Sequence, residues 1–195
     1  MPSFMRVIDD RVGYPLRCRN LVRKLAPYLY GATTVLDLGS SSGRLAQQLS
    51  KALPGVSFSG VDTCVQPVSF IPVSRSDGKK LPFPDASFDC VMMVDVLHHD
   101  TDPWSIMMES ARVARKFVLI KDHYWKSRLD FLTLKYSDYI GNKPYDVSLP
   151  YNFLRMEDWE GLISSLGLKV VASERFRYKH PPMDMCRQVI FRLQK

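Results

Sequence analysis

The chain has 195 residues, of which 46% are hydrophobic and 24% are charged, and its formal net charge is +7. This length provides one substantial core and excludes two full-sized domains, so we predict a single domain over residues 1–195. No apolar stretch is long enough to span a bilayer, and the four cysteines are scattered singly, which argues against a CxxC zinc site or a disulfide framework.

The predicted elements alternate between strand and helix along the chain. Short β-rich apolar runs predict seven strands, over residues 33–38, 56–61, 70–73, 88–94, 116–121, 170–176 and 188–193. Apolar residues at helical spacing predict five helices, over residues 14–30, 43–52, 103–114, 123–140 and 156–166. This alternation predicts an α/β fold with a mostly parallel seven-stranded sheet and helices on both faces.

The first predicted strand contains Asp37 and leads into a loop of small residues from Gly39 to Gly43. Small residues let the backbone approach a ligand at the carboxyl end of a strand, and the amides of the next helix point into the same crevice. The alternative interpretation is a tight strand-to-helix turn that needs glycine for its own backbone. The dinucleotide fingerprint would require glycine at Ser41 and Arg44, so the spacing argues against a nicotinamide enzyme.

Asp62 ends the second predicted strand. An acidic side chain in this place can accept both hydroxyls of a ribose. The alternative is a solvated carboxylate at the end of a strand.

The stretch from Ser76 to Asp89, SDGKKLPFPDASFD, resembles class I S-adenosylmethionine-dependent methyltransferases of the broad type 11 group, and the resemblance runs from Val35 to about Lys121. It implies a Rossmann-like methyltransferase fold and S-adenosyl-L-methionine as cofactor. It also implies four cofactor-binding segments. They are a glycine loop, an acidic residue that binds the ribose, a turn that contacts the edge of the adenine, and a segment at the methionine end of the cofactor. The cofactor-binding residues that follow are Asp37, Gly39, Ser40, Ser41, Gly43, Asp62, Asp77, Gly78 and Asp95.

Ser41 is a departure from the family pattern, because the family loop usually has a glycine there. The serine would tighten the loop, or its hydroxyl would bond the cofactor carboxylate.

Methyl transfer from a sulfonium is an in-line displacement, so the protein mainly positions and desolvates the reactants. A general base is needed only if the acceptor arrives protonated. The candidates are His98, His99 and His123, and we select His99 and His123 as catalytic residues because neutral imidazole accepts a proton near pH 7. The alternative is that these histidines cap or pack a helix. We expect no metal, because the histidines are few and dispersed apart from the pair His98–His99.

Aromatic residues are frequent between Tyr124 and Phe153. They predict a substrate lid or insertion over residues 123–155, with Tyr124 and Tyr151 as substrate contacts, which would exclude water from the reaction. The alternative is aromatic packing under a long loop.

The positive charge lies outside the central segment, since residues 1–34 and 112–195 carry net charges of +4 and +7 and residues 35–111 carry −4. A solvated surface explains this distribution, and the sharper alternative is an anionic small-molecule substrate.

The sequence contains no tract of Lys and Arg residues that would indicate binding to nucleic acid. The first residues lack the layout of a secretory signal, so we predict a cytoplasmic protein. We favour a methyltransferase for small molecules. The alternatives are an RNA or protein methyltransferase and a non-catalytic S-adenosylmethionine-binding protein.

Overall fold

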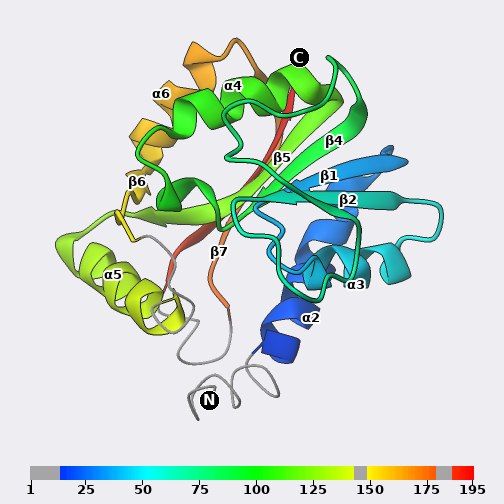
Figure 1. Ribbon diagram of the computed structural model, residues 1–195. Coiled ribbons are helices and arrows are strands. Elements are labelled where there is room, and N and C mark those ends of the chain that lie inside the picture. The colour runs from blue at the N-terminus through cyan, green and yellow to red at the C-terminus, as the bar shows by residue number, and fades with distance from the viewer. Residues whose placement is uncertain (1–13, 143–148, 179–185) are drawn as a thin grey trace.

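The computed structural model describes residues 14–142, 149–178 and 186–195, and a mixed sheet of eight strands forms its centre (Figure 1). The strands are β1 Thr34–Leu38, β2 Ser57–Asp62, β3 Val73–Arg75, β4 Phe88–Val94, β5 Ala114–Trp125, β6 Leu154–Arg155, β7 Lys169–Phe176 and β8 Gln188–Gln194. Seven strands are ordered β3-β2-β1-β4-β5-β8-β7, and β6 pairs with β5 off this path.

The strands from β1 to β6 pair in parallel, whereas β8 runs antiparallel between β5 and β7. Parallel strands end at the same edge of a sheet, so β1, β2, β4 and β5 direct their following loops to one edge. The prediction of a mostly parallel α/β sheet is confirmed. The predicted number of seven strands is corrected to eight, because the two-residue β6 is too short to leave a pattern in the sequence.

Helices cover both faces of the sheet (Figure 1). The described helices are α2 Tyr14–Leu25, α3 Arg44–Ala52, α4 Pro103–Val113, α5 Arg128–Asn142 and α6 Met156–Ser165, with short 3₁₀ turns η2 Ala26–Leu29 and η3 Leu97–His99. α4 and α6 pack on one face, and α2 and α3 pack on the other. Within the described residues, no helix is both long and apolar enough to cross a membrane.

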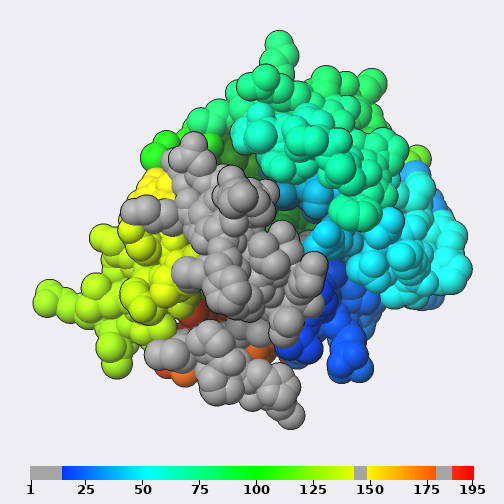
Figure 2. Space-filling view, turned by 60° about the horizontal axis from the view of Figure 1, so that its bottom comes forward, coloured from blue at the N-terminus to red at the C-terminus, as the bar shows by residue number. Residues whose placement is uncertain are grey.

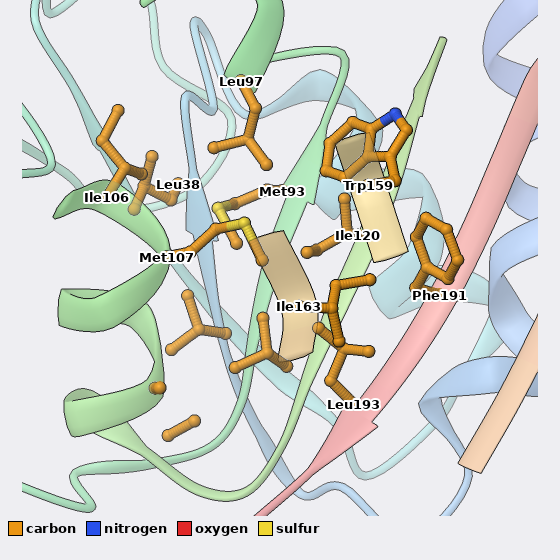
Figure 3. Packing of buried hydrophobic residues seen from close by; sticks show 14 of the residues in the cluster. Leu38, Met93, Leu97, Ile106, Met107, Ile120, Trp159, Ile163, Phe191 and Leu193 are labelled. Carbon is orange, nitrogen blue, oxygen red and sulfur yellow. The ribbon is translucent and has the colours of Figure 1, made fainter. Parts of the chain in front are cut away.

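The core under α4 and α6 shows how apolar spacing positions these helices. Ile106 and Met107 of α4 face the sheet, where Met93 is buried (Figure 3). On α6, Trp159 packs against Phe191 of β8 with ring centroids 5.8 Å apart. Full burial of each such side chain stabilises the fold by about 1.5–3 kcal/mol, so this cluster holds the outer helices on the sheet.

α4 begins as its sequence predicts. The side chain of Asp102 accepts a hydrogen bond from the backbone N–H of Ser105 at 3.1 Å, and Pro103 occupies the first turn. The helix therefore starts immediately after the loop that follows η3.

The predicted helix over residues 123–140 is wrong at its beginning. β5 continues to Trp125 because His123 pairs with Gln188 of β8 and Tyr124 pairs with Leu154 of β6. Pairing with strands that are distant in sequence overrides the local helical spacing. The third strand is also shifted, from the predicted 70–73 to Val73–Arg75.

Candidate functional site

The loop between β1 and α3 turns through positive φ angles at Gly39 (77°), Ser41 (50°) and Gly43 (73°). A Cβ atom at Gly39 would lie 2.4 Å from Val96 Cγ2, and one at Gly43 would lie 2.3 Å from Ile71 Cγ1. The two glycines are therefore required by the chain's own packing, whatever ligand the loop binds. Ser41 adopts the left-handed conformation while its backbone N–H donates to Asp62 Oδ2 at 2.7 Å, a bond that accompanies this unusual backbone.

Asp62 stands at the end of β2 beside this loop. Its Oδ2 atom accepts the amide of Ser41, and its Oδ1 atom accepts the amide of Cys64 at 3.0 Å. Nearby, burial and the charge of Asp62 raise the pKa of Asp37 to about 7. The hydroxyl of Ser40 is buried and has no hydrogen-bond partner in the described structure. The carboxylate oxygens of Asp62, beside the glycine loop, fit a ligand that carries hydroxyl groups.

Asp37→Asn is expected to stabilise the cofactor-free protein above about pH 7. The pKa of Asp37 is about 7 in the folded protein and near 3.8 in the unfolded chain, so the folded state loses stability as the pH rises through this window. Asparagine cannot ionise, so the advantage of the variant should grow across the window and then stay constant, at no more than about 4 kcal/mol. Urea unfolding at about pH 5 and about pH 8 measures the difference. Equal gains at both pH values would show that ionisation of Asp37 is not the cause.

The turn after β3 lies beside Asp62. The amide of Ser76 donates to the carbonyl oxygen of Asp62 at 2.9 Å, and the exposed Asp77 accepts the amide of Lys79 at 3.0 Å. Gly78 is buried at φ 78°, where a Cβ would contact Leu38. The structure thus brings the glycine loop, Asp62 and the Asp77–Gly78 turn to the same edge of the sheet.

Charged side chains gather at the neighbouring ends of β4 and β5. Asp95 directly follows β4 with φ 56°, and its carboxylate is bound by Arg17 of α2 at 2.7 Å and by Lys121 of β5 at 2.5 Å. Burial alone would raise the pKa of Asp95, but the positive charges of its two partners, Lys121 above all and then Arg17, hold it well below its ordinary value. Asp95 is therefore an ionised carboxylate, and a ligand that contacts its Oδ2 atom must share it with Arg17.

The three candidate histidines lie together next to Asp95. His98 is buried, and its Nδ1 atom is 2.6 Å from Asp122 Oδ1. Burial alone would lower the pKa of His98, but the charge of Asp122, the hydrogen bond with Asp122 and the nearby Asp138 carboxylate raise it to about 10. His98 is thus an imidazolium at neutral pH and not a base.

The pKa of His123 is shifted in the opposite direction to that of His98. Burial is the largest effect on it and lowers its pKa below the ordinary value, in spite of the charge of Asp95. Its Nδ1 atom is buried without a hydrogen-bond partner and lies 3.4 Å from Asp95 Oδ1. His99 is partly exposed, with Nε2 3.8 Å from Asp138 Oδ1. Of the two histidines predicted to be catalytic, His123 is the neutral imidazole that a general base requires.

Part of the predicted lid packs against η3. The amide of Asn152 donates to the carbonyl oxygen of His98 at 3.2 Å, and the ring of Phe153 stacks on the His98 ring with centroids 5.0 Å apart. Tyr151 lines an open cavity of about 480 Å³ together with residues of α5. Tyr124, by contrast, lies in the apolar core with 4% of its surface exposed, so we do not retain it as a substrate contact. Residues 143–148, which include Tyr145, lie outside the described residues.

Figure 2 shows one face of the molecule, with α5 in yellow-green and α2 in blue on opposite sides. Two side chains from these helices contribute to the charged cluster, Arg17 from α2 and Asp138 from α5. Sequence reasoning selected neither of them as a site residue, nor did it select Lys121. Both helices therefore help to build the edge that the sequence motifs predict.

The sheet and its loops define a Rossmann-like class I methyltransferase fold. Residues 36–118 match the family model described as a methyltransferase domain. This match covers less than half of the chain and lies within the segment whose motifs resemble the type 11 group.

Three comparisons illustrate the similarity. The chain is 48% identical over 40 residues to a 27-O-demethylrifamycin SV methyltransferase of Amycolatopsis mediterranei, covering 20% of this chain and 15% of that protein. It is 32% identical over 92 residues to an uncharacterised methyltransferase of Mycobacterium sp. (strain JLS), covering 44% of this chain and 36% of that protein. A solved methyltransferase from Archaeoglobus fulgidus has the same fold, with TM-score 0.73, 18% identity and coverage of 99% and 100% of the two chains. The matched segments therefore span only 15% and 36% of the lengths of these two curated relatives.

Proposed function

We propose that the chain transfers a methyl group from S-adenosylmethionine to a small-molecule acceptor by in-line displacement. The observation that carries this proposal is the meeting of the glycine loop, Asp62 and the Asp77–Gly78 turn at one edge of a methyltransferase domain. The cofactor supplies an electrophilic methyl group on a sulfonium. The relative named for a rifamycin substrate supports a small molecule as the acceptor.

Each cofactor-facing residue has a proposed task that follows from its place. Asp62 accepts the ribose hydroxyls, and the loop from Gly39 to Gly43 presents backbone amides to the carboxylate end. The Asp77–Gly78 turn recognises the adenine edge. Asp95, held by Arg17 and Lys121, places a negative charge where the cationic end of the cofactor requires one.

The acceptor is proposed to lie beyond Asp95, near His99 and His123. His123 is neutral enough to take a proton from an acceptor hydroxyl or ammonium group, and His99 is the more exposed of the pair. The segment over residues 123–155 would cover this place, because Asn152 and Phe153 already pack against His98. Covering the acceptor excludes water and holds the reacting atoms in line.

Incubation with methyl-labelled S-adenosylmethionine and fractionated cell extract tests the proposed function. We expect the label to enter the small-molecule fraction, and calorimetry to show binding of S-adenosylmethionine but little binding of nicotinamide dinucleotides. Label in RNA or in protein would replace the proposed acceptor class. Tight cofactor binding with no label transferred to any fraction would indicate a non-catalytic binding protein.

A further inference from the structure

Two adjacent histidines of η3 face one carboxylate of α5. Asp138 Oδ1 lies 3.6 Å from His98 Nε2 and 3.8 Å from His99 Nε2, and the three ligand atoms all lie within 4.8 Å of one another. These distances exceed the usual length of a hydrogen bond. They come close to the roughly 3.3 Å that separates two ligand atoms bound tetrahedrally to one zinc ion at about 2.0–2.1 Å.

Two of these three side chains, His98 and Asp138, are held by neighbouring groups as ligands are held in metal sites. The other ring nitrogen of His98, Nδ1, bonds to Asp122 at 2.6 Å, and Asn142 Nδ2 donates to Asp138 Oδ1 at 2.6 Å. Ligating histidines almost always donate their second N–H to a carboxylate or carbonyl, which fixes the ring and the tautomer. The cluster therefore has an ordered outer layer as well as three convergent ligand atoms.

In the described part of the chain, the Asp138 carboxylate also lacks a hydrogen bond to one of its two oxygens. Its side chain is only 7% exposed, and its Oδ2 atom is buried without any hydrogen-bond partner among the described residues. A buried carboxylate oxygen without a partner is costly, and a cation that binds the carboxylate compensates for the lost hydration.

A second group of possible ligands, formed by His98, Asp122 and His123, is less suitable. His98 Nδ1 and Asp122 Oδ1 already form a hydrogen bond of 2.6 Å, and Asp122 also accepts the amides of Leu97 and His123. An ion bound there would have to break this arrangement, whereas an ion at the first group would keep it.

We propose that His98, His99 and Asp138 bind one divalent transition-metal ion, with zinc favoured by two imidazoles and one carboxylate. The ion displaces the proton from His98 Nε2, which is released to solvent, while the His98 Nδ1 atom keeps its bond to Asp122. Three protein ligands leave a fourth position for water or for a donor atom of the acceptor, as in catalytic zinc sites. Because the ligands come from η3 and α5, the ion would also fasten α5 to the end of β4. The proposal concerns metal binding alone and is independent of methyl transfer.

Titration of the full-length chain tests the site, after removal of any affinity tag and dialysis against a chelator. We expect calorimetry with Zn²⁺ to show one tight site, and Co²⁺ to develop the visible absorption of a protein-bound ion. Both measurements are made without S-adenosylmethionine, so failure of the proposed function does not affect them.

Variants locate the site. His99→Gln and Asp138→Asn should each abolish tight binding, and Asp122→Asn should weaken it by about 10–100-fold because it supports a ligand from the outer layer. His123→Gln and the exposed control Glu157→Gln should bind as the unmodified chain does. Circular dichroism checks that each variant is folded, and the partly exposed His99 provides a test if Asp138→Asn is not. Absence of tight binding, or tight binding that survives His99→Gln and is lost in His123→Gln, would overturn the proposal.

Discussion

Asp62→Ala is expected to reduce affinity for S-adenosylmethionine by about ten- to a hundred-fold. Hydrogen bonds to a charged acceptor contribute about 1.5–3 kcal/mol, and each 1.4 kcal/mol corresponds to about a tenfold change in affinity. The structure adds a second reason, because Asp62 Oδ2 accepts the amide of Ser41 and thereby holds the glycine loop in its turn. The variant should fold, since Asp62 lies at the end of β2 and outside the apolar core.

Calorimetric titration with S-adenosylmethionine measures this effect, and two further variants separate its causes. Asp62→Asn retains an oxygen that can accept the Ser41 amide, so its loss should be smaller than that of Asp62→Ala. Asp85→Asn removes an exposed carboxylate that pairs with Arg112 near the start of β4, at the opposite edge of the sheet, and should bind normally. If folded Asp62→Ala binds the cofactor as tightly as the unmodified chain, then Asp62 is only a surface carboxylate and the ribose assignment fails.

The proposed cofactor edge was largely predictable in its arrangement because its signals are local in sequence. A β-rich run, a loop of small residues and an acid at the end of the next strand each fall within a few positions, and parallel pairing brings them to one edge. Ser41 shows the limit of this reasoning. The sequence identifies the departure from glycine, but the amide bond to Asp62 that accompanies its positive φ depends on the folded loop.

The charged cluster was only partly predictable because its members come from distant elements. His99 and His123 were identifiable as residues that follow or end strands. Asp138, by contrast, cannot be distinguished in the sequence from any other polar residue of an amphipathic helix. Its burial depends on how α5 packs, and that packing depends on where β5 ends. Because pairing with β6 and β8 extends β5 to Trp125, local periodicity places the start of α5 several residues too early.

The same cause explains the reassignment of Tyr124. As part of a lid helix it would contact substrate, but as part of β5 it alternates with its neighbours, so its side chain enters the core and His123 turns toward Asp95. A change from helix to strand over three residues therefore changed the face on which each side chain lies.

Asp122→Asn is expected to be among the most destabilising single substitutions, with a loss of about 3–5 kcal/mol. Removing one partner of a buried ion pair leaves the other charge poorly compensated, and here the remaining partner is His98, whose side chain is 3% exposed and would keep only the more distant Asp138 carboxylate at 3.6 Å. Leu97 and His123 donate their backbone N–H groups to different oxygens of the carboxylate, and asparagine would replace one of these oxygens by an NH2 group, which cannot accept. Since a domain is stable by only about 5–15 kcal/mol, a large part of the stability would be lost.

A double-mutant cycle with His98→Asn tests whether the ion pair is the cause of this loss. Urea unfolding is measured in chelator and without cofactor, so that binding does not contribute to stability. The double variant should be destabilised by much less than the sum of the single variants, because no unpaired charge remains, and a higher yield of soluble double variant reports the same effect if Asp122→Asn does not fold. Asp89→Asn is the matched control: Asp89 is also buried, but its cationic partners Arg115 and Lys116 are half exposed and can return to water. Strictly additive losses for Asp122 and His98, or an equal loss for Asp89→Asn, would show that burial of the pair is not what stabilises this edge of the sheet.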